Sequence, residues 1–435
     1  MKFETPVNVN YAATIVRVPE PLTVLGLDKL VAIPMFGYQV LTQKDGIKAG
    51  DLRVLFVAES QLSEEYARLN NLHREATLND DAGQTGYLEA NRRVRAIRLR
   101  KNNSSALLMP LESLAYTSID VAQLEVGDTF DTLNGHEVCR KYEIPGKQAQ
   151  GAPGQPKIRQ RVDQKLFPMH LDTEHLFRNW HALREPKRVV ITQKLHGTSI
   201  RIGRVPAVRD KGWLERVVVN KWLRIPTPDT AYEDVAGSRR VIKGRSDNNH
   251  FYDSDIWADY AKRLEGLIPE NYVVYGELIG WETDDKPIQK GYTYNLRPGE
   301  RELYVYRVAT VNGQGVIADL SWEGVEQFCS ALGLKTVPVF ETDIWHSRND
   351  EDDAVYTRVV THNYLDRNLT QPLPGYEKGG WSNAVPLSNP VSVDEGVCLR
   401  IDGQVPRIFK AKSPIFFEHE TKMLDKGEED LEAAA

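Results

Sequence analysis

The stretch that most constrains the fold of this chain is a segment of low complexity from Pro145 to Gln160. Glycine, proline and glutamine dominate it, which is typical of a flexible linker. We therefore expect two domains, residues 1–144 and 161–435, joined by residues 145–160. A chain of 435 residues is long enough to bury the cores of two or three domains.

The N-terminal domain is predicted to be a small β-barrel or sandwich. Short alternating or apolar runs are separated by turn signals such as Pro19 and Gly50-Asp51. The expected strands cover residues 13–18, 29–34, 38–41 and 52–57.

A basic run, Asn91 to Lys101, lies in the same domain, and six of its eleven residues are Arg or Lys. As a strand it would place Ile97 and Leu99 on one face and basic residues on the other. This density of positive charge predicts a stripe that contacts phosphates, with Arg95, Arg98 and Arg100 as its candidate residues. A solvated strand face is the alternative.

The C-terminal domain is predicted to combine antiparallel strands with flanking helices. Strand patterns cover residues 189–191, 200–205, 215–219, 240–246, 272–280, 303–308, 394–401 and 407–413. Helical spacing covers residues 171–183, 256–264 and 320–332, and an acidic tail, residues 418–432, is expected to be a solvated helix. No element is predicted in residues 343–385, which are polar and irregular. The fold class is therefore α+β.

Lys194 ends the apolar run that begins at Val189, and a turn with Gly197 and two hydroxyl residues follows it. Burial disfavours the charged form of a lysine and can lower its pKa, and a neutral amine is a nucleophile. An ordinary edge-strand lysine before a turn is the alternative that this segment alone leaves open.

Further chemically suggestive residues follow Lys194 in a fixed order. They are the Lys194-Leu-His196-Gly197 run, Arg245, the Tyr-Gly-Glu277 strand end, the pair Tyr304 and Tyr306, Asp394-Glu395-Gly396, and Lys410-Ala-Lys412. This order resembles the covalent nucleotidyltransferases, which include ATP-dependent DNA and RNA ligases and mRNA capping enzymes. His196 together with Thr198 is similar to the RNA ligase branch.

The placement of the barrel-like domain ahead of this series resembles the Deinococcus-type RNA ligases, which carry an N-terminal oligonucleotide/oligosaccharide-binding (OB) domain. Too few residues follow Lys412 for a second barrel. The resemblance implies an N-terminal OB-like β-barrel followed by a nucleotidyltransferase (ATP-grasp-like ligase) domain of antiparallel sheets with flanking helices.

The resemblance also implies a role for each candidate residue. Lys194 would carry AMP, and Lys410 and Lys412 would contact the α-phosphate, so these three are the expected catalytic residues. The other expected nucleotide-binding residues are His196, Gly197, Glu277, Arg245 near the ribose or 5′-phosphate, and Tyr306 (failing it Tyr304) stacked on adenine. Glu395 and Glu277 would hold Mg²⁺ or Mn²⁺, because carboxylates are hard oxygen donors. Gln193 departs from the family, whose members often carry Glu there.

The implied activity is ATP-dependent sealing of 3′-OH/5′-phosphate nicks in duplexes with RNA on the 3′-OH side. Lysyl-AMP and an adenylylated 5′-end would be its intermediates. A DNA ligase, a 5′-adenylating enzyme and a catalytically inactive nucleic-acid-binding protein remain the alternatives.

Composition sets further expectations. Cys139, Cys329 and Cys398 lie far apart without metal-ligand spacing, which suggests a reducing compartment. With no apolar run near the ~20 residues of a membrane span and no signal-peptide pattern, we expect a cytoplasmic monomer without a membrane partner. The net charge is −6, so any nucleic-acid binding must come from local patches.

Overall fold

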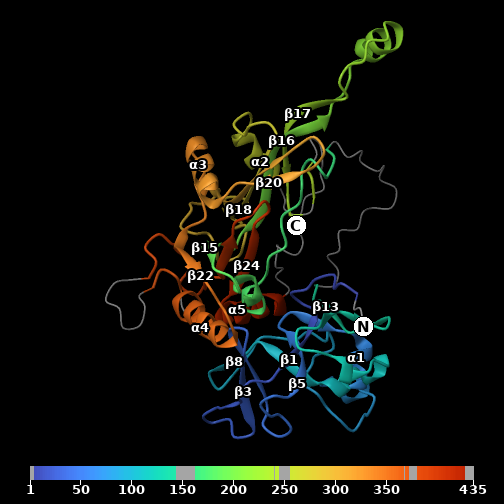
Figure 1. Cartoon of the computed structure of the whole chain (residues 1–435), viewed down its shortest axis with the longest axis vertical. Coiled ribbons are helices and arrows are strands. Elements are labelled where there is room, and N and C mark those ends of the chain that lie inside the picture. The colour runs from blue at the N-terminus through green and yellow to red at the C-terminus, as the bar shows by residue number, and fades with distance from the viewer. Residues whose placement is uncertain are drawn as a thin grey trace.

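The structure is a computed structural model of the chain, and it describes residues 4–143, 162–239, 241–243, 255–366, 368–371 and 380–426. The predicted linker, Arg245 and most of the strand expected at residues 240–246 lie outside these ranges. An N-terminal part, residues 4–143, lies at one end of the molecule, and a larger C-terminal part, from residue 162 onward, rises above it (Figure 1).

The N-terminal part is built from small antiparallel sheets. The first has the order β10 (Thr129–Phe130), β1 (Ala13–Arg17), β5 (Leu52–Val57), β9 (Ala106–Pro110), and the second the order β2 (Leu22–Thr23), β3 (Leu30–Met35), β4 (Tyr38–Gln43). Shorter pairs are β6 (Ser60–Leu62) with β13 (Cys139–Lys141), β7 (Ile97–Leu99) with β8 (Asn102–Ser104), and β11 (Thr132–Leu133) with β12 (His136–Glu137). The one α-helix described in this part is α1 (Glu64–Leu69). The strands predicted here are confirmed, but the sheets described are open and do not form a closed barrel.

Successive side chains of β1 and β5 point to opposite faces of the sheet, and both faces are buried. Ile15 and Phe56 pack into one hydrophobic cluster, whereas Val16 and Leu55 pack into another on the opposite face. The four-stranded sheet therefore forms the middle layer of the N-terminal part.

Two antiparallel sheets form the C-terminal part. The sheet that carries Lys194, here called the lysine sheet, has the order β14 (Glu174–His175), β24 (Arg407–Lys412), β23 (Gly396–Ile401), β15 (Lys187–Lys194), β22 (Val339–Trp345), and only its β14–β24 pair is parallel. The second sheet has the order β17 (Thr230–Gly237), β16 (Thr198–Val208), β18 (Tyr272–Gly280), β19 (Arg301–Val311), β20 (Ile317–Asp319). A short strand, β21 (Lys335–Thr336), pairs with β19 in parallel.

Helices cover the sheets, and two of them occur where helical spacing predicts them. These are α2 (Ile256–Arg263), capped by Asp255, and α3 (Trp322–Leu332), capped by Ser321. Their apolar faces share a buried cluster with Val274 and Leu278 of β18. The opposite face of β18 carries Tyr275 and Glu277, and this face turns toward the site described below.

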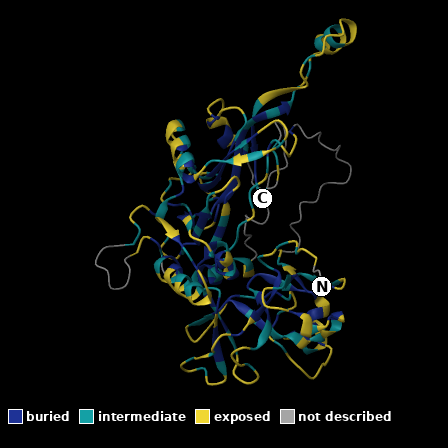
Figure 2. Cartoon of the chain, viewed as in Figure 1, coloured by how far each residue is buried: buried dark blue, intermediate teal, exposed yellow. Residues whose placement is uncertain are grey.

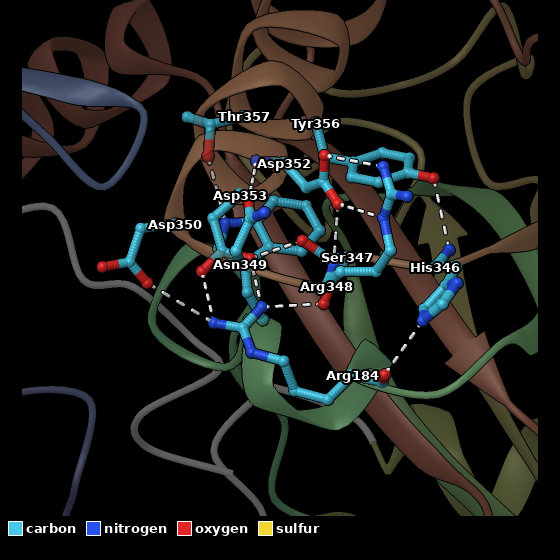
Figure 3. Close-up of polar contacts among 11 residues, drawn as sticks. Arg184, His346, Ser347, Arg348, Asn349, Asp350, Asp352, Asp353, Tyr356 and Thr357 are labelled. Carbon is cyan, nitrogen blue, oxygen red and sulfur yellow. Dashed lines mark hydrogen bonds and ion pairs between the residues drawn. The ribbon is translucent and has the colours of Figure 1, made fainter.

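The region in which the sequence predicts no element, residues 343–385, contains the end of β22 and α4 (Asp350–Val360), followed by a wide helical turn, Thr361–Leu365. Figure 3 shows the polar network that holds the start of α4. Asn349 caps the helix. The two terminal nitrogens of the Arg184 guanidinium, Nη1 and Nη2, donate to the two carboxylate oxygens of Asp353, at 2.6 and 2.8 Å. Acidic residues fill the first turn of α4, where the helix dipole favours them.

Two predictions of local structure are wrong, and a third is correct only in part. Residues 215–219 are not a strand but part of a helical turn, Glu215–Trp222, because no neighbouring strand pairs with them in the part of the chain that the structure describes. Residues 171–183 form β14 and two short 3₁₀ turns rather than one helix. The acidic tail is helical over residues 418–425, within α5 (Pro414–Asp425), as predicted, but its Glu418, Glu420 and Thr421 are buried rather than solvated, and residues 427–432 lie outside the described residues.

Candidate active site

Lys194 is the last residue of β15, and the strand register places it in one row with Lys412. Lys194 lies opposite Gly396 of β23, and Gly396 lies opposite Lys412 of β24. A Cβ at Gly396 would lie 2.0 Å from the carbonyl oxygen of Ala411, and the φ of Gly396 is +140°. Only glycine therefore allows the three strands to approach closely enough to bring the two lysines together.

Glu395 joins the two lysines. Its Oε1 atom lies 2.9 Å from Nζ of Lys194 and 3.2 Å from Nζ of Lys412, and its side chain is 1% exposed. Lys412 also contacts Oε1 of Glu420 on α5, at 3.2 Å. The buried carboxylate therefore holds the two lysine side chains at one point of the site.

Glu277, at the end of β18, holds the loop that follows Lys194. It accepts hydrogen bonds from the backbone N–H of Gly197, at 3.0 Å, and from Oγ of Ser199, at 3.4 Å. A Cβ at Gly197 would lie 2.3 Å from the carbonyl oxygen of Leu278, so glycine is needed here for close contact with β18. His196 lies beside the lysines, with Nδ1 3.5 Å from Oε2 of Glu395.

An open cavity lies next to Lys194, between the two sheets. Its lining includes Lys194, Glu277, Tyr306 and Thr192, and also His170 and Arg239. Lys410 and Lys412 are not among its lining residues, although Lys410 shares the face of Lys412 on β24.

A β-bulge decides which tyrosine faces the cavity. The register between β18 and β19 shifts between Tyr275 and Gly276, so Tyr306 and Arg307 both line the cavity although they are consecutive. Tyr304 does not line the cavity, and Lys335 packs over its ring. Of the two candidate tyrosines, Tyr306 is therefore the one that lines the cavity.

Polar residues that were not predicted as site residues also line the cavity, His170 and Arg239 among them. Nδ1 of His170 lies 2.7 Å from the hydroxyl of Tyr306, and Arg239 lies 3.0 Å from Asp172. Both residues lie within or next to strand and loop segments without a distinctive spacing, so spacing alone did not identify them as site residues. Arg245 is outside the described residues.

Gln193 has a structural role. Its amide accepts a hydrogen bond from the backbone N–H of Val385, at 2.7 Å, and donates to the carbonyl oxygen of Val385, at 3.1 Å. It also donates to Asp394, at 3.3 Å, and burial raises the pKa of the Asp394 carboxyl to about 6. Both ends of the Gln193 amide are used, so the residue fixes the segment around Val385 beside β15.

The basic run 91–101 does not form an open stripe. Arg98 contacts Glu418 at 2.9 Å, Arg95 is paired with Asp425, and Arg100 donates to the carbonyl oxygen of Gly26. The first two contacts bind the N-terminal part to α5. The structure therefore assigns Arg95 and Arg98 a contact between the two parts, and their binding of nucleic acid stays a prediction.

The candidate metal ligands fit an ion that arrives with a nucleotide. Among the residues that the structure describes, no group of three or more His, Cys, Asp or Glu is arranged to hold a metal ion by itself. Mg²⁺ is usually held by one or two carboxylates together with substrate phosphates and water. Glu395 and Glu277 both lie at the Lys194 loop, so they fit such a shared site.

The fold is similar to that of solved RNA ligases. The RNA ligase of Naegleria gruberi with pyrophosphate aligns with a TM-score of 0.59 and 18% identity over 96% of this chain and 100% of that chain. Two single-residue mutants of that ligase, one with ATP and Mn and the other with AMP and Mn, each align with a TM-score of 0.57 and 18% identity, over 94% of this chain and 98% of that chain.

A family model described as RNA ligase matches residues 187–412, just over half of the chain. The chain therefore belongs to the RNA ligase family. A search of curated proteins gives no match. The matched region begins with β15 and ends at Lys412, so it contains Lys194, Glu277, Glu395 and both C-terminal lysines. None of the helices described is both long and apolar enough to cross a membrane.

Proposed function

We propose that this protein is an ATP-dependent RNA ligase that seals 3′-OH/5′-phosphate nicks in duplexes with RNA on the 3′-OH side. The observation that carries the proposal is the sharing of buried Glu395 between Lys194 and Lys412 beside an open cavity between the two sheets. The Naegleria structures with ATP, AMP and Mn support the same chemistry.

In the proposed first step, Nζ of Lys194 attacks the α-phosphorus of ATP. A P–N bond forms, the bond from the α-phosphorus to the bridging oxygen breaks, and pyrophosphate leaves with that electron pair. The amine must lose a proton to attack, and the nearby positive charge of Lys412 favours that loss. Lys412 then supplies positive charge beside the α-phosphate, with Lys410 next to it on β24.

The other residues bind and orient the nucleotide. Tyr306 stacks on adenine, Arg245 contacts the ribose or 5′-phosphate, and His196 and Gly197 form the loop beneath the phosphates. Glu395 and Glu277 would hold a Mg²⁺ or Mn²⁺ ion, which would supply positive charge against the leaving pyrophosphate.

Two further steps complete the reaction. The AMP passes from Lys194 to the 5′-phosphate of the nick, which breaks the P–N bond and forms a phosphoanhydride. The 3′-OH then attacks that 5′-phosphate, a phosphodiester forms, and AMP leaves. Residues 1–144 act as an OB-like nucleic-acid-binding domain, joined by the linker 145–160 to an adenylyltransferase domain, residues 161–435, in a cytoplasmic monomer.

The deciding experiment incubates the purified chain with Mg²⁺ and ATP labelled at the α-phosphate. We expect covalent label on the wild type and none on Lys194→Ala. Lys187→Ala is the matched control, because Lys187 begins the same strand and its side chain is 41% exposed. Equal absence of label from the wild type and Lys194→Ala would show that the protein is not a transferase.

A second measurement tests the substrate. Sealing is compared on nicks with RNA or DNA at the 3′-OH end, and we expect the RNA-ended nick to be joined faster. Equal rates on both nicks, or accumulation of adenylylated 5′-ends without joining, would contradict the proposed selectivity. They would identify a DNA ligase or a 5′-adenylating enzyme, respectively.

A further inference from the structure

A two-stranded ribbon carries a projecting segment away from the second sheet. β18 pairs with β16 only from Thr198 to Gly203, whereas β17 follows β16 to its end at Val208. The segment between them, residues 209–229, is here called the arm. Figure 1 shows the arm at the end of the molecule opposite the N-terminal part.

The arm exposes large apolar side chains that serve no core. Trp213 is 66% exposed and Trp222 82%, and Leu214, Leu223 and Ile225 are all more than half exposed. Figure 2 shows that the arm is largely solvent-exposed. An apolar surface of this kind on a folded protein usually marks an interaction site.

Polar contacts within the arm hold its shape without the tryptophans. Lys211 contacts Asp229 at 2.7 Å and donates to the carbonyl oxygen of Thr227 at 2.8 Å. Arg209 donates to the carbonyl oxygen of Pro228 at 2.8 Å and is paired with Glu215. Removal of the indole rings would therefore leave the fold of the arm intact.

The charge of the arm favours an anionic partner. It has five basic and three acidic residues, in a chain whose net charge is −6. Two of the basic residues are used in the internal pairs above. Across the described parts of the chain, no ion pair involves the other three, Arg216, Lys221 and Arg224.

We propose that the arm binds unpaired nucleotides of the nucleic-acid substrate at a distance from the joint. Arg216, Lys221 and Arg224 contact phosphates, and Trp213 and Trp222 stack on bases. Open aromatic faces next to basic side chains are the combination that binds single strands without sequence preference. Paired bases inside a duplex do not present a free face, so the arm selects an unpaired flank or end.

The length of β16 sets the distance. Ser199 lines the cavity, and nine residue steps separate it from Val208, which is about 30 Å at ~3.3 Å per residue. A duplex advances about 3.4 Å per base pair, so the arm reaches nucleotides roughly nine base pairs from the joint. This inference rests on the proposed function, which places the joint at the cavity.

The test measures binding of the full chain to three nicked duplexes by fluorescence anisotropy. One has flanks of six base pairs, the second has a nine-base-pair flank followed by a ten-nucleotide single-stranded tail, and the third has the same total length fully paired. The variants are Trp213→Ala/Trp222→Ala and Arg216→Ala/Lys221→Ala/Arg224→Ala. Ile344→Ala and Arg348→Ala are the matched controls, because both side chains are about two-thirds exposed elsewhere.

We expect the tryptophan variant, which loses two rings, to bind the tailed substrate at least about thirtyfold more weakly and the six-base-pair substrate as the wild type does. The charge variant should lower the slope of log K against log salt by about two on the tailed substrate only. Equal affinities for all variants, or an equal loss on the short substrate, would overturn the proposal. A shift of the wild type, but not the variant, to a dimer in sedimentation would instead assign the arm to self-association.

Failure of the arm proposal and failure of the proposed ligase activity are distinguishable. Arm variants should adenylylate Lys194 and seal the six-base-pair nick at wild-type rates, because the arm is not part of the cavity. Absence of adenylylation in the wild type would count against the ligase proposal. The arm proposal is tested separately, because anisotropy with the tailed probe does not need ATP.

Discussion

Gly396 is the residue at which packing most directly determines the site. Any side chain there would overlap the carbonyl oxygen of Ala411 and separate β23 from β24. We expect Gly396→Ala to lower the free energy of unfolding by about 3 kcal/mol or more, as strained and overpacked sites do, and to abolish adenylylation. Gly313→Ala is the control, because a Cβ at Gly313 meets nothing within 4 Å. Urea unfolding and label transfer measure the two effects, and similar behaviour of both variants would contradict this account.

The position of Tyr306 at the cavity leads to a prediction about nucleotide binding. Tyr306→Ala removes the ring that faces the cavity, whereas Tyr306→Phe keeps the ring and loses only the contact between the hydroxyl and His170. We expect the KM for ATP in adenylylation to rise about tenfold for Ala, since stacking on a base contributes about 1–3 kcal/mol, and less than threefold for Phe. An equal rise for both variants would mean that the hydroxyl, and not the ring, binds the nucleotide.

At the scale of elements, α5 connects the site to the N-terminal part. Glu420 contacts Lys412 on one side of the helix. On the other side, Thr421 donates a hydrogen bond to Glu59 at 2.6 Å and accepts one from the backbone N–H of Ala96 at 3.1 Å. The position of Lys412 and the docking of the N-terminal part therefore depend on the same helix.

Substitution of Glu418 and Glu420, the two glutamates of α5, tests these two roles separately. Glu420→Gln removes the charge that holds Lys412, so we expect adenylylation to slow about tenfold, the effect of losing about 1.4 kcal/mol of a charge-assisted contact. Glu418→Gln removes only the partner of Arg98 and should leave adenylylation within twofold of the wild type. Label transfer at saturating ATP measures both, and equal slowing would mean that α5 acts only by holding the two parts together.

The elements also show where sequence patterns are informative. Alternation predicts β18 and β19, and helical spacing predicts α2 and α3, because each of these buries one face against a neighbour. Val217, Val218 and Val219 favour a strand by propensity, yet they lie in a helical turn because no strand is available beside the arm in the described chain.

The sequence predicts which residues belong to the site better than it predicts the contacts among them. Lys194, Glu277, Glu395 and Lys412 do lie together, and their catalytic roles stay predictions. The bulge beside Tyr306 leaves no pattern in the sequence. The burial of Glu418 depends on Arg98, a partner 320 residues away, which local reading of an acidic tail does not reveal.

At the scale of the whole molecule, the contact between the two parts predicts a pH dependence. Burial raises the pKa of the Glu59 carboxyl to about 7, against the opposing effect of Arg93. Protonation of Glu59 therefore favours the folded state. Its contribution to stability is complete below pH 4.5, the pKa of the unfolded chain, and is lost as the pH rises through 7.

Glu59→Gln tests this dependence. The amide keeps an acceptor for Thr421 but does not titrate. We expect the free energy of unfolding of the wild type, relative to the variant, to fall by up to about 1.4 kcal/mol per pH unit between pH 5 and 7. Asp394 titrates in the same range in both proteins, so the difference removes its effect. A difference that does not change with pH would show that Glu59 is ionised in the fold.

The strand order of the lysine sheet has a consequence for how the protein is made. β15 lies between β23 and β22, and Lys194 is paired with Gly396, about two hundred residues later in the chain. The second sheet pairs strands that are closer in sequence, so it can form while the chain is still leaving the ribosome. Pairing of β15 with β23 closes a loop of about two hundred residues, which costs more entropy than the shorter loops of the second sheet. This pairing cannot form before β23 has been made. Lys194 thus receives Glu395 and Lys412 only after β23 and β24 have been made, so a chain that stops before these strands lacks both contacts.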